Sequence, residues 1–397
     1  MSGWGEQLSI IAMPWLVLFL TSEAWALGLV MSLFTIPMSV FMLLGGVIVD
    51  RFSSKQVLLV AKYANAFFLF ILSLLLYFDA LTLSLLCLLA ILMGTSSAFT
   101  IPAASSFLPG LVSREQLQAA NSIGISLRTI VSWVGPLSAA LLIGTGKSSA
   151  ENLALVFLLD GLSVLFSALI LHKVIVRQRE TSPELNFKQG IVQACGYFWQ
   201  HKALREIVIY VAVIGLFIAG PIGIGLPLFI KEELGGGAGF FGYLMSAEAL
   251  GIFTGVTVAG KFSTIGKLTL GQSLLLADGI VGVALAALSL ITSLYPGLFL
   301  LFIIGMVTGY AQVSLITWVQ QQASPHMLGR LMSIVMFIVI GLAPLSTGLC
   351  GLVMTYIAPG TLFIVSGAGL IAVALSALFL TQVSRVQSNN AHARDNL

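Results

Sequence analysis

Charged residues are scarce in this sequence. Asp, Glu, Lys and Arg make up 8% of its 397 residues, whereas a soluble domain usually carries about 25%. Histidine and cysteine are also rare, with four and three residues, and their spacing indicates neither a disulfide framework nor a metal site. We therefore expect no metal and no cofactor, no binding of nucleic acid, and no enzyme activity.

Apolar residues are abundant instead, at 58% of the chain or about 230 side chains. A bilayer core about 30 Å thick needs ~20 apolar residues per helix, so ~12 helices account for nearly this whole supply. Backbone polar groups must be paired inside lipid, which leaves helices or closed barrels, and long continuous apolar runs exclude barrels. The composition predicts an all-α polytopic membrane protein.

Apolar runs separated by charged, Pro, Gly or Ser residues define twelve transmembrane helices. They lie near residues 3–20, 26–47, 56–78, 82–104, 117–143, 153–175, 206–230, 240–260, 268–292, 296–320, 331–356 and 360–382. The first run also imitates a signal peptide, because Ala24-Trp25-Ala26 follows it. No positive segment precedes it, so we expect an uncleaved first span.

The basic residues predict the orientation. With the N-terminus inside, sixteen of the 18 Lys and Arg residues lie on one side, and only Lys147 and Lys231 lie on the other. Positive loops stay cytoplasmic. We expect a multi-pass protein of the cell membrane, in a bacterial-type inner membrane, with both termini cytoplasmic.

The longest polar stretch divides the chain into halves. We expect a six-helix bundle over 1–176, a cytoplasmic linker over 177–205, a second six-helix bundle over 206–382 and a cytoplasmic tail over 383–397. Apolar residues at helical spacing between Phe187 and Phe198 predict an amphipathic helix on the membrane surface. A solvated linker is the alternative.

The two halves repeat each other. Pro136-Leu137-Ser138 returns 208 residues later as Pro344-Leu345-Ser346, and Arg51-Phe52-Ser53-Ser54 returns 210 residues later as Lys261-Phe262-Ser263-Thr264. Two nearly equal offsets between equivalent spans indicate a duplicated unit, as in one large class of secondary transporters. Chance matches in an apolar sequence are the alternative.

One loop carries a specific motif, Gly46-Val47-Ile48-Val49-Asp50-Arg51-Phe52-Ser53-Ser54-Lys55. It resembles the signature loop of the major facilitator superfamily, Gly-x-x-x-Asp-Arg-x-Gly-Arg-Lys, at Gly46, Asp50, Arg51 and Lys55. The resemblance implies a major facilitator fold of two pseudo-symmetric bundles. It also implies a cytoplasmic gate loop in which Asp50 binds a helix N-terminus, where a carboxylate is favoured. The alternative is an ordinary charged loop.

Further patterns resemble the macrolide-efflux-type branch of that superfamily. They are Pro109-Gly110-Leu111-Val112, Ala120-Asn121, Arg128, Gly135-Pro136, residues 190–201 and Gly329-Arg330. Pro136 predicts a kink in the fifth span, which the branch associates with export. Ala139 and Ala140 replace the two glycines of the antiporter motif, and a purely structural kink is the alternative.

Four carboxylic residues fall inside spans: Glu6, Asp160, Glu248 and Asp278. Such residues are costly in lipid and mark proton or substrate pathways. The resemblance implies that spans 1, 4, 7 and 10 line the cavity and that the outer helices support it. Glu6 and Glu248 are therefore the better candidates for proton coupling, and Asp160 and Asp278 have a structural role as the main alternative. Gly251 and Gly255 form a small-residue face beside Glu248, which allows an interhelical hydrogen bond instead.

Candidate cavity residues come from the spans that the resemblance places inside, together with Arg128 on span five. They are Trp15, Arg128, Tyr310, Ser314, Thr317 and Trp318. Tyr310, Ser314 and Thr317 share one helical face, and simple packing is the alternative for each aromatic residue. In span seven, Gly220-Pro221 weakens the helical hydrogen-bond ladder.

Together these features predict a secondary active transporter, a proton-coupled exporter of amphipathic drugs or metabolites that works by alternating access. Its partners are a small amphipathic substrate, protons and the lipid bilayer, and we expect a monomer. The alternatives are an exporter of siderophore-like or lipid-like molecules and a non-transport scaffold or sensor.

Overall fold

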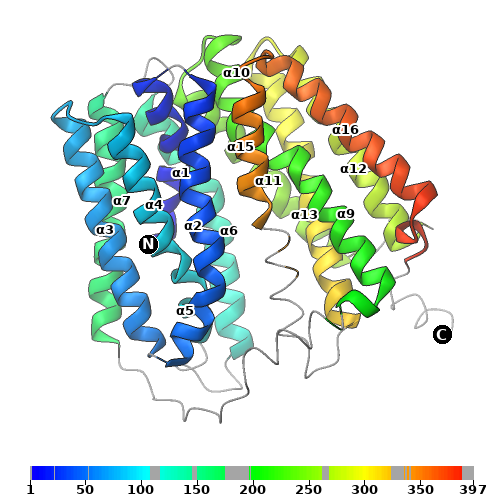
Figure 1. Cartoon of the computed structure of the whole chain (residues 1–397), viewed down its shortest axis with the longest axis horizontal. Coiled ribbons are helices and arrows are strands. Elements are labelled where there is room, and N and C mark those ends of the chain that lie inside the picture. Colours follow the sequence, from blue (N-terminus) through cyan, green and yellow to red (C-terminus); the bar gives the residue numbers. More distant parts are fainter. Residues whose placement is uncertain are drawn as a thin grey trace. The chain divides into compact units, whose positions relative to one another are not determined.

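The computed structural model describes residues 2–21, 23–51, 53–107, 117–144, 150–174, 198–261, 268–322 and 341–386, together with positions 196, 335 and 338. Every regular element in this part of the chain is a helix (Figure 1). The elements are α1 (Ser2–Leu20), α2 (Ala24–Arg51), α3 (Ser54–Tyr77), α4 (Leu83–Ala98), α5 (Thr100–Phe107), α6 (Leu117–Ile143), α7 (Ala150–Lys173), α9 (Lys202–Gly220), η2 (Pro221–Gly225), α10 (Leu226–Glu232), α11 (Ala238–Lys261), α12 (Leu270–Ala287), η3 (Leu288–Leu290), α13 (Leu294–Gln322), α15 (Ala343–Val353), α16 (Pro359–Leu380) and η4 (Val383–Arg385).

The described residues contain nine helical segments that are long and apolar enough to cross a bilayer, and three shorter apolar helices. The shorter ones are Leu83–Ala98, Leu127–Ile143 and Ala343–Val353. Each of these twelve segments overlaps a different predicted span. The prediction of an all-α protein with twelve membrane helices is confirmed.

Span seven departs from α-helical geometry where the sequence suggested weakness. A π-helical turn, η2, separates α9 from α10 and begins at Pro221. Proline has no backbone N–H to continue the ladder, and π-turns inside helices are often found at functional sites.

Contacts group the chain into two compact units. Unit 1 contains Met1–Pro183, Leu226–Ser246 and Thr347–Tyr356, and unit 2 contains Glu184–Gly225, Ala247–Ser346 and Ile357–Leu397. Unit 1 thus holds the first six spans together with two segments from the second half of the chain. The domain boundaries drawn from the sequence stay predictions.

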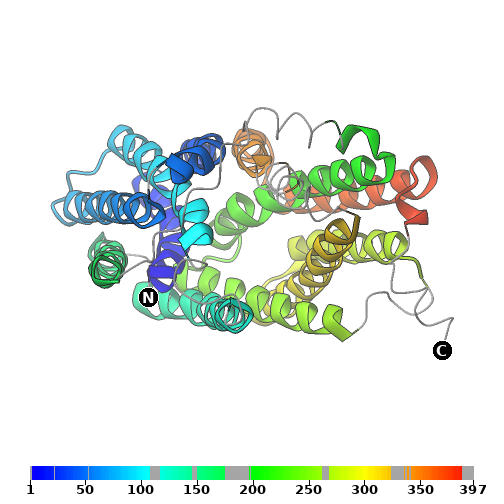
Figure 2. The same ribbon diagram turned by 90° about the horizontal axis from the view of Figure 1, so that it is seen from below.

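Helix α1 is central to unit 1. It packs against α6 and α7, while α3 packs against α7 and α2 against α4 (Figure 2). Leu8, Ile11 and Leu16 of α1 are fully buried. In unit 2, α12 packs against α16 and α13, and α9 packs against α16. The predicted amphipathic helix of the linker lies almost entirely outside the described residues.

Candidate functional site

Asp160 lies on α7 with 3% of its surface exposed. Its Oδ2 accepts a hydrogen bond from Ser9 Oγ of α1. Its Oδ1 is buried and has no hydrogen-bond partner, and the same is true of Ser163 Oγ one turn further along α7. The position predicted to be structural therefore does join two helices, but it also buries an oxygen that lacks a partner.

Three further charged side chains lie near the Ser9–Asp160 contact or act on one another there: one on α1, one on α3 and one on α6. Glu6 is exposed and experiences the charges of Lys62 on α3 and Arg128 on α6. Lys62 Nζ donates to Ser2 Oγ at 2.9 Å, and Asp160 experiences the charges of Glu6 and Lys62. Two carboxyls and two cations thus form a charged cluster, which we define as Glu6, Lys62, Arg128 and Asp160.

Asp278 is the second buried carboxyl of the described residues, with 8% of its surface exposed. It lies on α12 in unit 2, where Tyr210 Oη of α9 donates a hydrogen bond to its Oδ2. In both units, therefore, a buried aspartate bonds a hydroxyl on the first helix of one half of the chain. Asp160 has charged residues, Glu6 and Lys62, close enough to act on it, whereas Asp278 has the uncharged phenol of Tyr210 as its partner.

Glu248 lies half-buried on α11. A Cβ on Gly305 of α13 would collide with the backbone oxygen of Glu248, and one on Gly251 would collide with the backbone oxygen of Phe302. The predicted small-residue face therefore brings α11 and α13 into backbone contact. Within the described residues, no hydrogen bond or ion pair is formed by the Glu248 carboxylate.

The gate-loop motif is described only in part. Gly46, Asp50 and Arg51 belong to the end of α2, and their side chains lie outside the described residues. Lys55 Nζ donates to the carbonyl oxygens of His172 at 2.9 Å and Val174 at 2.8 Å. Because cations are favoured at a helix C-terminus, Lys55 caps α7, a role that the motif did not predict.

The repeated Pro-Leu-Ser segments make equivalent contacts. In unit 1, Ser138 Oγ accepts from Trp4 Nε1 of α1 at 3.1 Å. In unit 2, Ser346 Oγ donates to the Leu216 carbonyl at 2.6 Å and accepts from Gly220 N at 2.7 Å. Ser346 thereby bridges two backbone groups next to the π-turn of span seven. In each half, the repeated serine holds the first span.

Gly135 and Pro136 lie inside α6, which runs unbroken to Ile143. A Cβ on Gly135 would collide with the Gln7 side chain of α1, and a Cβ on Gly242 of α11 would lie 2.7 Å from the Pro136 carbonyl oxygen. These residues therefore form a close-packed face of α6. The kink itself stays a prediction.

The segments of the second half that belong to unit 1 contact α1, α2 and α6 through small residues and one lysine. Lys231 Nζ donates to the Leu18 carbonyl near the end of α1 at 2.6 Å. Gly28 and Gly351 pack backbone to backbone, because a Cβ on Gly28 would lie 2.7 Å from the Gly351 Cα. In the predicted orientation all these residues lie toward the extracytoplasmic side.

The predicted cavity residues differ in exposure. Trp15, Tyr310, Ser314 and Trp318 are buried, and Thr317 is exposed. The Trp15 indole N–H is buried without a hydrogen-bond partner, and Tyr310 contacts Ser273 of α12. Arg128 is exposed on α6.

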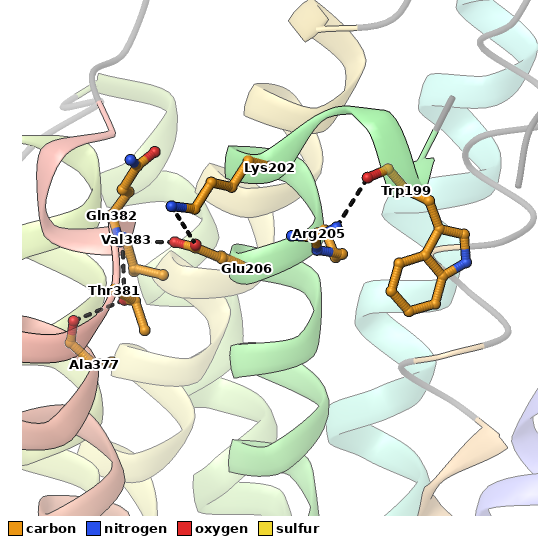
Figure 3. Close-up of polar contacts among 8 residues, drawn as sticks. All are labelled: Trp199, Lys202, Arg205, Glu206, Ala377, Thr381, Gln382 and Val383. Carbon is orange, nitrogen blue, oxygen red and sulfur yellow. Dashed lines mark hydrogen bonds and ion pairs between the residues drawn. The ribbon is translucent and has the colours of Figure 1, made fainter. Parts of the chain in front are cut away.

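Polar contacts at the start of α9 attach it to the segment after α16 (Figure 3). Glu206 accepts from Gln382 N at 2.7 Å and lies 3.7 Å from Lys202 Nζ. Arg205 donates to the Trp199 carbonyl at 3.0 Å, and its guanidinium lies 5.5 Å from the centre of the Trp199 ring. Trp199 is 61% exposed, and an exposed tryptophan beside basic residues is typical of a membrane interface.

Sequence reasoning missed four contributors to these sites: Lys62, Ser9, Tyr210 and Ser346. Lys62 was counted only among the basic residues of the cytoplasmic side, although it lies about two turns inside α3, which begins at Ser54. In the part of the chain that the structure describes, no group of three or more His, Cys, Asp or Glu residues could hold a metal ion.

Comparisons with known proteins identify the family. The profile of the Major Facilitator Superfamily matches residues 1–347. Macrolide efflux protein A of Streptococcus pyogenes is 24% identical over 378 residues, which cover 92% of this chain and 90% of that protein. Multidrug efflux pump Tap of Mycobacterium bovis is 24% identical over 407 residues, covering 95% and 91%.

A shorter match and a solved structure agree with this assignment. Enterobactin exporter EntS of Escherichia coli is 29% identical over 136 residues, covering 34% of this chain and 33% of that protein. The crystal structure of a mutant of the nucleoside transporter NupG has the same fold, with a TM-score of 0.73 at 14% identity and coverage of 95% and 98%. This chain is a multi-pass membrane protein that belongs to the major facilitator superfamily.

Proposed function

We propose that this protein is a proton-coupled exporter of amphipathic drugs or metabolites. The observation that carries the proposal is the similarity to two efflux proteins over more than nine-tenths of the chain. Because these relatives are named for macrolides and for several drugs, large amphipathic molecules are the substrate class to test first.

Coupling to protons is supported by the carboxyls inside spans. Glu6 is exposed near the predicted cytoplasmic end of α1, and Glu248 lies half-buried on α11 without a described partner. An ionisable carboxyl inside a membrane span is a candidate proton carrier. Glu248 qualifies because it has no described counter-ion, and Glu6 because it is exposed, so both remain our coupling candidates for the two halves.

Alternating access requires that contacts at one end of the pathway break during the cycle. The Lys231 and Gly28–Gly351 contacts are suited to this task, because they join segments of the second half of the chain to α1 and α2. We assign them to the closure of the extracytoplasmic end. The gate loop with Asp50 would serve the cytoplasmic end.

The charges favour a cationic or neutral substrate. Lys62 and Arg128 balance Glu6 and Asp160 in unit 1, whereas among the described residues no cation acts on Glu248 or Asp278 in unit 2. Export of a siderophore-like or lipid-like anion is the second candidate function. The partial similarity to EntS and the exposed guanidinium of Arg128 favour it.

Transport by purified protein in liposomes tests the proposal. Ethidium is the cationic probe and erythromycin the neutral-to-cationic macrolide. We expect an imposed pH gradient to drive accumulation of at least one probe, and an ionophore that collapses the gradient to abolish it. Flux that ignores the gradient would remove proton coupling, and no flux of either probe would favour the second candidate function.

A growth-toxicity panel tests the role of Glu248. We expect Glu248→Gln to lose protection, because an amide cannot carry a proton. Glu232→Gln changes an exposed carboxylate at the end of α10 and is the matched control. Unchanged protection by Glu248→Gln across the panel would eliminate Glu248 as a coupling residue.

A further inference from the structure

Asp160 buries an oxygen that no described residue hydrogen-bonds. Its side chain is 3% exposed, Oδ2 is bonded by Ser9, and Oδ1 has no partner. An ionised carboxylate needs donors at both oxygens, and leaving a buried acceptor unsatisfied is costly. The site is therefore incomplete as a purely structural hydrogen bond.

Ser163 is a neighbouring hydroxyl that also lacks a partner. It lies three residues after Asp160 on α7, so the two side chains are neighbours on one helical face. A Cβ on Gly5 of α1 would collide with both Asp160 Oδ1 and Ser163 Oγ, which shows that the two oxygens lie against the same point of α1. Ser163 Oγ also has no hydrogen-bond partner. A hydroxyl both donates and accepts, so Ser163 can bond Asp160 in either charge state: its O–H donates to the carboxylate, or its Oγ accepts from the carboxylic acid.

Helices α1, α3 and α6 pack against α7 and each carries a charged residue of the cluster; those of α1 and α3 act on Asp160, and that of α6 acts on Glu6. Glu6 lies on α1, Lys62 on α3 and Arg128 on α6. Among the described residues, none of these cations forms an ion pair within 4.0 Å of Asp160. Glu6 is exposed, directly follows Gly5 on α1, and its charge acts on Asp160, which makes it the accessible carboxyl nearest in sequence to the buried site.

We propose that Asp160 is a proton-binding site of this transporter, with Ser163 as its second hydrogen-bond partner and Glu6 as the accessible carboxyl that supplies the proton. The proposal rests on the proposed function and deepens it. When Asp160 is ionised, Oδ1 accepts from the Ser163 hydroxyl. When a proton transfers from Glu6 to Oδ1, the new O–H donates to Ser163 Oγ, and the Ser163 hydroxyl rotates away.

The change in hydrogen bonding between Asp160 and Ser163 is transmitted to α1 through Gly5. Because Gly5 leaves no space between the α1 backbone and the two oxygens, a change in their separation displaces α1. The resemblance places α1 along the substrate pathway. Proton binding at Asp160 would thereby alter the helix that contacts substrate.

Infrared spectroscopy of the purified full chain tests proton binding directly and needs no substrate. We expect one component of the carboxylic-acid C=O band that grows as pH falls to be missing in Asp160→Asn and to shift its midpoint in Ser163→Ala. Asp278→Asn removes the other buried aspartate and should leave that component in place. A spectrum of Asp160→Asn identical to that of the wild type would overturn the proposal.

Transport in liposomes tests the consequence. We expect Asp160→Asn to lose ethidium accumulation driven by the pH gradient while it keeps ethidium exchange at equal pH, and Asp278→Asn to keep both. If the wild type ignores the gradient, the proposed function fails, while the infrared titration still decides the proton site. If the wild type is driven and Asp160→Asn is driven equally, the proton site fails alone. Should Asp160→Asn not fold, the midpoint of Ser163→Ala decides, and an unchanged midpoint counts against the proposal.

Discussion

The surroundings of Asp160 in unit 1 and of Asp278 in unit 2 differ, although both side chains are buried carboxyls. Each aspartate accepts a hydrogen bond from a hydroxyl on the first span of its half. Asp160 has Glu6 and Lys62 as charged neighbours and one oxygen without a partner. Asp278 instead accepts a hydrogen bond from the uncharged Tyr210 hydroxyl. We therefore base the proposed proton site on the neighbours of each carboxyl and not on burial alone.

Glycines next to the two aspartates give the sharpest contrast. Gly5 lies against Asp160, while a Cβ on Gly279 would meet nothing within 4 Å. We expect Gly5→Ala to destabilise the protein by about 1–3 kcal/mol through overpacking and to abolish transport. Gly279→Ala should be neutral or slightly stabilising, since alanine is the better helix former. Thermal unfolding in detergent measures both, and equal stability of the two variants would contradict the close contact at Gly5.

The hydroxyl partners separate stability from coupling. Tyr210→Phe leaves Asp278 without its donor, and we expect a loss of about 1–3 kcal/mol in unfolding free energy with the pH dependence of transport unchanged. Ser9→Ala should instead shift the pH dependence of transport, because it removes a donor to the proposed proton site. A pH profile of ethidium transport for each variant checks this. A shift in Tyr210→Phe alone would indicate that Asp278, and not Asp160, is the proton site.

The repeated serines extend the comparison to the two halves. Ser346 satisfies two backbone groups of span seven, so Ser346→Ala should cost about 1–3 kcal/mol and increase hydrogen exchange at the Gly220 amide. Ser138 accepts one bond from a tryptophan, and Ser138→Ala should cost about 0.5–1.5 kcal/mol. Unfolding and hydrogen-exchange measurements on both variants check this order. A larger loss of unfolding free energy in Ser138→Ala than in Ser346→Ala would contradict it.

The helix-capping lysines give the smallest effects. Lys55→Met and Lys231→Met each remove a cation from a helix C-terminus, and we expect about 0.3–1 kcal/mol from each. Lys231→Met should in addition make a cysteine placed at Leu18 react faster with an aqueous thiol reagent, because the contact at the end of α1 is lost. Lys55→Met should leave that rate unchanged.

The fold was predictable because each membrane span depends on a property of one short segment, the length of its apolar run. A span needs about 20 apolar residues, and such runs can be counted along the chain, so all twelve were found. The repeats and the gate-loop motif then indicated duplicated halves, and the family match agrees with them. Gly251 and Gly255 were also recognised as a packing face, because small residues four apart share one side of a helix.

The site was less predictable because its contacts join distant positions. Ser9 and Asp160 are 151 residues apart, and Tyr210 and Asp278 are 68 apart. Neither pairing follows from spacing. Lys62 fell inside the predicted span 56–78 but was used only to set the orientation, because spacing along one span does not show which residues of other spans it faces. The sequence identified the four carboxyls but not which of them lacks a partner.

Proton movement driven by substrate tests the central claim most directly. Liposomes that contain the purified protein and an enclosed pH indicator are given an ethidium gradient and no pH gradient. We predict that ethidium flow drives protons in the opposite direction in the wild type and in Asp278→Asn, and that this proton movement is lost in Asp160→Asn. Ethidium flow without proton movement in the wild type, or an equal loss in both variants, would contradict the account.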